Sequence, residues 1–298
     1  MYDMHYDLLT ILYFNFLEKN KFANQIKCIE NIKGMYSSNN IKGGIINLYF
    51  MSEEEMKNEL DIDKENLYDV LTMFKESIHI LQYLKYKNII PNDTDFLYSI
   101  EGCDYIKNLE ELEELYNLGL RAILPVWNNE NKYGSGFKTD KGLTLKGKDL
   151  VKKAIDLGII IDLSHANPNT FDGIIDVISS EQQKGKNPIV IASNSNCRSL
   201  CDRKRNLTDE QLIKLKNVGG IIGLLSNSKF ISTDFVENTY QERQKWLLKH
   251  IKHVLNLGFP MDKIILSTDD MYFSPDSSSL PHPKPVPAQT RYTAPARS

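Results

Sequence analysis

The sequence predicts an α/β protein built as a (β/α)₈ TIM barrel, and three observations support this fold class. Eight short apolar segments alternate for the most part with segments of helical periodicity. The apolar segments are hydrophobic throughout, as expected of parallel strands that are buried on both faces. Polar residues follow many of these segments, at the strand ends where such barrels carry their chemistry.

The composition is that of an ordinary globular protein. With 298 residues, of which 41% are hydrophobic and 25% charged, the chain can bury a sizeable core. The formal net charge of −3 gives no reason to expect a nucleic acid or an anionic membrane as partner. The sequence has no apolar run of membrane-spanning length, and acidic residues stand where a secretory signal carries positive charge. We therefore expect a cytoplasmic protein whose four cysteines are reduced thiols.

Four strands are expected in the first half of the chain. The long helix between the second and third strands has an apolar stripe that includes Leu67, Phe74 and Leu81. The next helix stops at Gly119, since glycine commonly terminates helices. A long loop over 128–141 is more typical of a binding loop than of a simple connection. The expected strands are 1–7, 43–50, 95–100 and 121–126, and the helices are 8–19, one opening at Ser52, 63–87 and 109–118.

The second half alternates more regularly. A helix closes at Gly158, and Thr208 is a suitable cap for a later helix. The expected strands are 159–163, 188–193, 220–225 and 263–268, and the helices are 146–157, 168–180, one opening at Thr208 and 240–257. Residues 1–273 are thus expected to form one barrel domain.

Residues 274–298 break this pattern. Five of the eleven prolines lie in the last eighteen residues, and proline neither continues a helix nor donates a backbone hydrogen bond. We expect this Pro-rich tail to be extended or disordered.

A candidate metal site begins at the first strand. His5 and Asp7 are two residues apart, so in a strand they share one face and can reach one cation. An isolated pair of this kind is usually only an exposed strand start. The metal-site interpretation is supported by polar or aromatic residues at the ends of later strands: Glu101, Trp127, His165, Asn194 and Asp269.

These residues belong to stretches that resemble the membrane dipeptidase (renal dipeptidase) family, peptidase family M19. The resemblance runs in family order from residue 1 to about residue 270. The matching stretches are 3–7, 100–102, 127–131, 142–144, 162–165, 192–196, 205–210, 219–223 and 267–269.

The resemblance implies a hydrolase of the amidohydrolase-like barrel type with two zinc ions. By this likeness His5 and Asp7 would bind the first zinc, Glu101 would bridge both ions, and His165 would bind the second. Asn194 stands where the family has a histidine that also binds the second zinc. An amide oxygen is a poorer zinc ligand than imidazole, so we expect a weakened second site. Cys103 and Cys197 are less suited to replace this ligand than to be buried, inert thiols.

The resemblance also implies substrate contacts. Arg205 would hold the substrate's carboxylate, a task for which the guanidinium fork is suited. Asp269 would transfer a proton to the leaving amine. Trp127, where some members have a substrate-side histidine, is expected either as a pocket wall or as ordinary core. Without the resemblance, Arg205 would be interpreted as part of a solvated basic turn.

Three functions are therefore expected in order of preference. The first is a zinc-dependent dipeptidase that hydrolyses small peptides by metal-activated water. The second is a catalytically impaired relative with a binding or structural role, and the third is a different metal-dependent hydrolase on the same barrel. A homodimer is compatible with the sequence.

Three further expectations concern structure. Relative to the family pattern, helices after the eighth strand are missing. His250 and His253 are expected at the surface or behind the site, and the glutamates of 110–114 on a solvated helix face.

Overall fold

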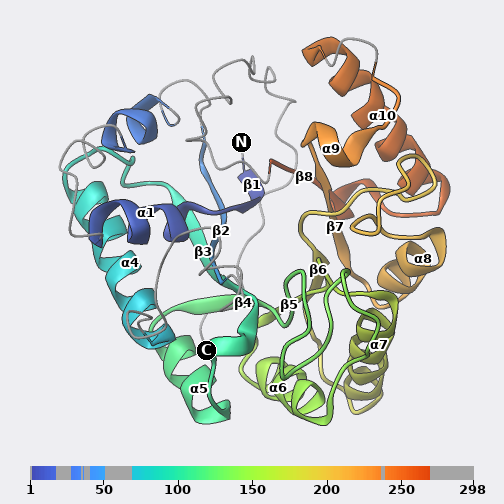
Figure 1. Cartoon of the computed structure of the whole chain (residues 1–298), viewed down its shortest axis with the longest axis horizontal. Helices are drawn as coiled ribbons and strands as arrows, with labels where there is room; N and C mark the ends of the chain where they lie inside the picture. Colours follow the sequence, from blue (N-terminus) through green and yellow to red (C-terminus); the bar gives the residue numbers. More distant parts are fainter. Residues whose placement is uncertain are drawn as a thin grey trace.

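The computed structural model describes residues 2–17, 28–34, 36, 41–50, 69–235 and 239–268. They form one eight-stranded sheet in which the strands neighbour one another in chain order and every pair is parallel. The sheet curls into a nearly closed ring with the helices outside it (Figure 1). The (β/α)₈ prediction is confirmed. The strands are β1 Tyr2–Tyr6, β2 Gly43–Tyr49, β3 Asp95–Glu101, β4 Leu120–Leu124, β5 Ile160–Asp162, β6 Val190–Ala192, β7 Ile221–Leu225 and β8 Ile264–Ser267.

The helices lie between the strands along the chain and cover the outside of the ring (Figure 1). They are α1 Leu8–Leu17, α4 Val70–Tyr86, α5 Leu109–Asn117, α6 Leu145–Asp156, α7 Pro168–Gln183, α8 Asp209–Asn217, α9 Ser228–Ile231 and α10 Tyr240–Asn256, with short 3₁₀ turns η2 Cys103–Tyr105 and η3 Met261–Lys263. The predicted helix start at Ser52, the first residues of the predicted helix 63–87 and the Pro-rich tail lie outside the described residues.

Local sequence explains where these helices begin and end. Thr208 caps α8 in a capping box, in which its side chain accepts from the Gln211 amide and the Gln211 side chain accepts in return. The turns after α5 and α6 pass through Gly119 and Gly158 with φ of 113° and 73°. These values favour glycine, because a Cβ is strained in this left-handed region.

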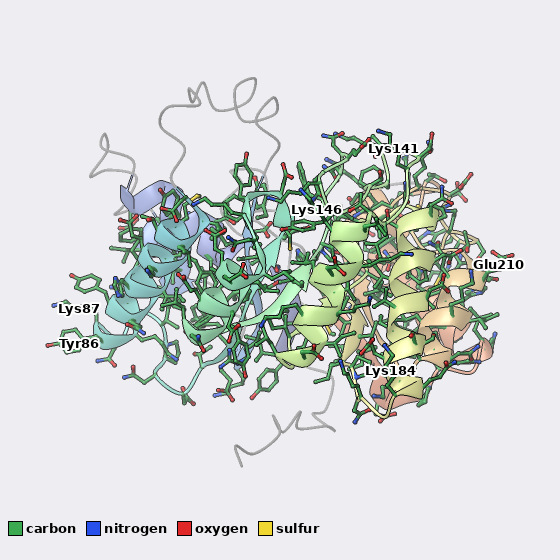
Figure 2. The ribbon with its side chains drawn as sticks, turned by 90° about the horizontal axis from the view of Figure 1, so that it is seen from below. Tyr86, Lys87, Lys141, Lys146, Lys184 and Glu210 are labelled. Carbon is green, nitrogen blue, oxygen red and sulfur yellow. The ribbon has the colours of Figure 1, made fainter. Side chains whose placement is uncertain are left out.

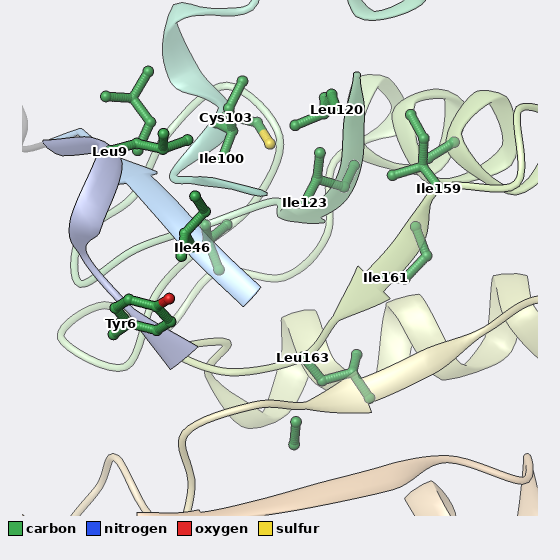
Figure 3. Packing of buried hydrophobic residues seen from close by; sticks show 14 of the residues in the cluster. Tyr6, Leu9, Ile46, Ile100, Cys103, Leu120, Ile123, Ile159, Ile161 and Leu163 are labelled. Atoms are coloured by element: carbon green, nitrogen blue, oxygen red, sulfur yellow. The ribbon is translucent and has the colours of Figure 1, made fainter. Parts of the chain in front are cut away.

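The apolar residues form two cores. The larger one lies between the strands and the outer helices and includes Leu9, Ile46, Ile123 and Leu163 (Figure 3). A smaller one fills the ring's interior with Met4, Ile45, Ala122, Ile160, Ile191 and Ile221. Because strand side chains alternate in direction, each strand serves both cores, which explains why its sequence is apolar throughout.

Asp3 connects the two ends of the ring. Its carboxylate accepts hydrogen bonds from the backbone amide of Thr268 (3.1 Å) and from the Thr268 hydroxyl, just after β8. The same carboxylate accepts from the His5 amide at 3.1 Å. One buried side chain thus fixes the end of β8 against the start of the strand that carries His5.

The long loop between β4 and α6 is folded rather than open. Its backbone forms isolated bridges between Glu130 and Ser135 and between Gly136 and Ala166. A Cβ on Gly136 would lie 1.7 Å from the Trp127 carbonyl oxygen, so only glycine fits there. The loop is therefore packed against the carboxyl ends of β4 and β5.

The expectation for Glu111 is wrong: it is not on a solvated face, because it is buried and accepts from the Lys107 amide. Of the two places expected for His250, the structure shows the buried one, where it links α10 to the segments after β6 and β7.

The outer surface carries many charged side chains, among them Lys146 of α6, Lys184 after α7 and Glu210 of α8 (Figure 2). Within the part of the chain that the structure describes, no helix is long and apolar enough to cross a membrane.

Candidate metal centre

The carboxyl end of β1 brings His5 and Asp7 to a buried position inside the ring. His5 Nε2 lies 3.1 Å from Oε2 of Glu101, at the end of β3, and 3.9 Å from Oδ1 of Asp7. One possible ligand atom from each of these three residues lies within 4.8 Å of the others. A single cation could therefore contact all three.

Glu101 stands between two histidines. Its Oε2 faces His5, and its Oε1 lies 2.7 Å from Nε2 of His165, which follows β5. His165 adopts φ of 65°, an uncommon conformation outside glycine, and its Nδ1 lies 3.0 Å from Oδ1 of Asn128. The carboxylate thus presents a different oxygen to each imidazole, as expected for a group between two ion positions.

Electrostatics keeps these side chains in the states that bind cations. Burial alone would raise the pKa of Glu101, but His5 and His165 outweigh it and hold this pKa well below its usual range. Burial, helped by Arg205, lowers the pKa of His165 to about 4 against the opposing effect of Glu101. At neutral pH His165 is therefore neutral and Glu101 ionised.

The donor set fits a divalent cation. Imidazole nitrogen and carboxylate oxygen are ordinary ligands of zinc, and three such protein ligands are the usual number in catalytic zinc sites. The placement of buried carboxylates among nitrogen donors is otherwise costly, because a buried charge needs a compensating partner. His5, Asp7 and Glu101 would hold one ion, and His165 shares Glu101 with it.

The position next to His165 differs from the first one. Asn194, two residues after the end of β6, is fully buried, and its Oδ1 accepts a hydrogen bond from Nη2 of Arg205. Nη1 of Arg205 donates to Ser195 Oγ at 3.2 Å. A guanidinium on the amide oxygen opposes cation binding there, since both would compete for the same electron pairs.

Arg205 is buried beside the site and not in a solvated turn. The family resemblance, rather than the local basic sequence, identified it as a site residue. Trp127 is half-buried, and its ring centroid lies 6.0 Å from that of His165 and 5.6 Å from that of Tyr49. The Trp127 ring therefore lies beside the imidazole of His165. Asp269 lies outside the described residues.

Three side chains around the site were not singled out from the sequence. Asn128 contacts His165, and Ser193 Oγ lies 2.7 Å from Nδ1 of His5. Asp162, the last residue of β5, accepts from the Ser193 amide at 3.1 Å. Each lies within or beside a stretch that supports the resemblance, so proximity to those stretches was the available signal.

The cysteines are free and buried. Burial raises the pKa of Cys103 strongly and that of Cys197 to about 12. Such thiols stay protonated at neutral pH, which is unsuited to metal binding.

The fold and this polar centre place the molecule among (β/α)₈ barrels whose buried histidines and carboxylates meet at the carboxyl ends of the strands. The family model for membrane dipeptidase (peptidase family M19) matches residues 2–270, and the chain belongs to this family.

Curated relatives share limited parts of the sequence. An uncharacterised protein of Acinetobacter calcoaceticus is 30% identical over 171 residues, which are 54% of this chain and 51% of the relative. An uncharacterised dipeptidase of Schizosaccharomyces pombe is 28% identical over 175 residues, or 57% of this chain and 40% of the relative. The matches thus span about half the length of the curated relatives.

Solved structures share the fold over nearly the whole chain. Dipeptidase AC, a metallopeptidase of family M19, matches with a TM-score of 0.66 and 20% identity, covering 94% of this chain and 86% of that one. A metallopeptidase from Rhodobacter sphaeroides, bound to a phosphinate mimic of L-Ala-D-Ala, matches with a TM-score of 0.64 and 20% identity over 94% and 87%. At this identity the likeness concerns the fold.

Proposed function

We propose that this protein is a zinc-dependent dipeptidase that hydrolyses small peptides with a free carboxylate. The observation that carries the proposal is the convergence of His5, Asp7, Glu101 and His165 at one end of the barrel. Membership of the membrane dipeptidase family supports the reaction type. Zinc is favoured among divalent cations because the cluster combines imidazole nitrogen with carboxylate oxygen.

The bound cation would supply an activated water and a polarised scissile carbonyl. Arg205 would bind the substrate's carboxylate, and its bonds to Asn194 and Ser195 orient the guanidinium for this role. Asp269, beyond the described end of β8, would carry the proton to the leaving amine. Trp127 would form one wall of the pocket and exclude water from that side.

The proposal includes one strong and one weak metal position. The imidazole of His5 and the carboxylates of Asp7 and Glu101 would bind the first ion. The second would depend on His165, a shared Glu101 and an amide that Arg205 already engages. We therefore propose one tightly held zinc ion and a second site of lower affinity.

The Asn194–Arg205 hydrogen bond also favours a second candidate function. If hydrolysis requires two ions, this chain is a catalytically impaired relative that binds ligands without turning them over. A different amide or ester hydrolase remains the third candidate, since the metal cluster alone does not define the substrate.

Turnover and metal content, measured on the same samples, test the proposal. Purified protein loaded with zinc is assayed on a panel of dipeptides, their C-terminal amides, N-acyl amino acids and lactones, and bound zinc is counted by mass spectrometry. Dipeptide hydrolysis that is lost on chelation and weak on the C-terminal amides supports the proposal. Bound zinc without turnover establishes the impaired candidate, and turnover confined to the other substrates establishes the third.

Arg205→Lys refines this test. The lysine keeps the charge but loses the bidentate fork, so KM for dipeptides should rise more than kcat falls. An equal effect on dipeptides and their amides would contradict the role of Arg205 in carboxylate binding.

A further inference from the structure

A row of buried polar side chains lies behind His5, on the side of its imidazole that faces away from Glu101. Ser193 Oγ lies 2.7 Å from His5 Nδ1, whereas Nε2 faces Glu101 and Asp7. Both His5 and Ser193 are fully buried. Neither is close to the surface, so this contact is not an exposed side-chain pair that water would replace.

Asp162 continues the chain beyond Ser193. It is 1% exposed, and its Oδ1 accepts from the backbone amides of Ser164 (2.9 Å) and Ser193 (3.1 Å). Its Oδ2 is buried and accepts no hydrogen bond among the described residues. Burial raises the pKa of this carboxyl, and His5 and the Ser193 hydroxyl oppose that rise.

The chemistry of imidazole makes this arrangement directional. A histidine that binds a cation through Nε2 must carry its proton on Nδ1, so Nδ1 donates to Ser193 Oγ. The hydroxyl hydrogen of Ser193 then needs another acceptor. Oδ2 of Asp162 is a candidate, because it has no hydrogen-bond partner among the described residues and belongs to the carboxylate that accepts from the Ser193 amide at 3.1 Å. A carboxylate accepts hydrogen bonds and does not donate, so it sets the direction of the whole chain.

We propose that Ser193 and Asp162 are positioning residues that hold His5 in the tautomer whose Nε2 can bind a metal ion. This inference rests on the proposed metal-binding function of His5. The chain Asp162–Ser193–His5 joins β5, the segment after β6, and β1, so it also fixes the imidazole ring relative to Glu101. Partners of this kind behind a metal-binding histidine commonly change metal affinity by about 10- to 100-fold.

Asp162→Asn gives the sharpest test, because the amide keeps an oxygen for the two backbone donors. Its NH₂ group would face the Ser193 hydroxyl as a donor, and the hydroxyl would then turn and donate to His5 Nδ1. His5 would shift to the tautomer with its proton on Nε2. Ser193→Ala removes the hydroxyl between Asp162 and His5, and should leave the two tautomers of His5 mixed.

Two readouts are measured in parallel. The first is the imidazole ¹⁵N shifts of His5 in the metal-free protein, assigned by their loss in His5→Gln. The second is zinc affinity by competition with a chelator. Without metal, the Glu101 carboxylate 3.1 Å from Nε2 favours a proton there in every variant, so the comparison is between variants. We expect the share of Nδ1–H to be highest in the wild type and to fall toward Nε2–H in Asp162→Asn, with about 10-fold or greater loss of zinc affinity in both variants. Because Asp162 acts through Ser193, the double variant should bind zinc no more weakly than Asp162→Asn alone.

Ser99→Ala is the matched control, since Ser99 is a fully buried serine of β3 whose hydroxyl has no partner in the described part of the chain. It should keep the wild-type tautomer and zinc affinity. The inference is overturned if Ser193→Ala and Asp162→Asn, shown to be folded by circular dichroism, keep the wild-type tautomer and zinc affinity as well. It is also overturned if the losses of zinc affinity in the two single variants add in the double variant. If Asp162→Asn does not fold, Ser193→Ala decides. A wild type that binds no zinc would refute the proposed function. The tautomer shifts would still test the contacts of Asp162, Ser193 and His5 separately.

Discussion

At the scale of the residue, Glu101 has the most demanding position. It is a buried carboxylate between two imidazoles, and each oxygen faces a different ring. Such a residue is costly to bury without a compensating charge. Its environment is therefore better explained by cation binding than by stability alone.

Glu101→Gln tests this explanation. The neutral amide cannot balance a cation and offers one acceptor oxygen instead of two, so bound zinc should fall to a small fraction of the wild-type amount. Zinc per chain is measured by mass spectrometry after dialysis. Glu111→Gln, which changes another buried glutamate away from the cluster, should keep its zinc. Equal zinc in wild type and Glu101→Gln would refute the role of Glu101.

Asn194→His tests the second position. Imidazole replaces an amide whose oxygen is held by Arg205, so the variant should bind close to one additional zinc ion per chain. Isothermal titration of the metal-free protein measures both stoichiometry and affinity. Asn194→Ala also removes the amide but adds no ligand, and should gain nothing. A gain in both variants would show that Arg205, rather than the missing imidazole, controls the site.

The residue scale is also where sequence reasoning was least complete. His5, Asp7, Glu101 and His165 lie at or just after the carboxyl ends of strands, and this position alone predicted that they meet. The burial of Arg205 required the family resemblance, because its neighbours in sequence are basic and polar. Ser193 and Asp162 have ordinary residue types, and only their contacts distinguish them.

At the scale of the element, β1 combines two tasks. It carries His5 and leads directly into Asp7, and its Asp3 holds the end of β8 through Thr268. Stability and metal binding therefore depend on the same five-residue strand.

Asp3→Ala should lower the free energy of unfolding of the metal-free protein by about 2–4 kcal/mol, because buried donors lose a charged acceptor. Urea unfolding, followed by circular dichroism, measures this loss. Thr268→Val removes only the hydroxyl bond and keeps the backbone amide donor, so its loss should be smaller, about 1–2 kcal/mol. An Asp3→Ala variant as stable as the wild type would show that other contacts hold β1 and β8 together.

His250 of helix α10 connects this helix to the backbone of two neighbouring segments. Its Nδ1 accepts from the Cys197 amide at 3.2 Å, and its Nε2 donates to the Ile231 carbonyl at 2.8 Å. Burial lowers its pKa below the usual 6.5, so the folded protein keeps it neutral where the unfolded chain takes up a proton. The free energy of unfolding must therefore fall as the pH drops below about 6.5.

Urea unfolding at pH 7.5 and 5.5 measures this dependence in the metal-free protein. His250→Gln removes the titrating group, so its loss of stability between these pH values should be smaller than that of the wild type, by at most about 1.4 kcal/mol per pH unit. His165 titrates in the same direction in both proteins and cancels in the comparison. Identical pH dependences would mean that His250 is accessible to protons in the folded state.

The strands and helices themselves were largely predictable. Apolar runs, caps and terminal glycines placed the described elements with boundaries that differ by a few residues, as at β6, predicted over 188–193 and observed at Val190–Ala192. The fold of the 128–141 loop was not predictable, because it depends on non-local contacts such as that of Gly136 with Ala166.

At the scale of the whole molecule, a parallel ring brings together residues that are far apart in sequence. His5 and Ser193 are separated by 188 positions and touch, because β1 and the end of β6 face the same interior. Eight strands that alternate with helices predict this convergence, whereas the exact contacts depend on the register of each strand pair.

Anomalous diffraction at the zinc absorption edge, from crystals of zinc-loaded protein, tests the central claim most directly. We expect an anomalous peak bonded to His5 Nε2, Asp7 and Glu101 at about 2.0–2.2 Å, and a weaker or absent peak beside His165 and Asn194. A zinc ion bound elsewhere, with His5 and Glu101 still paired to each other, would contradict the account.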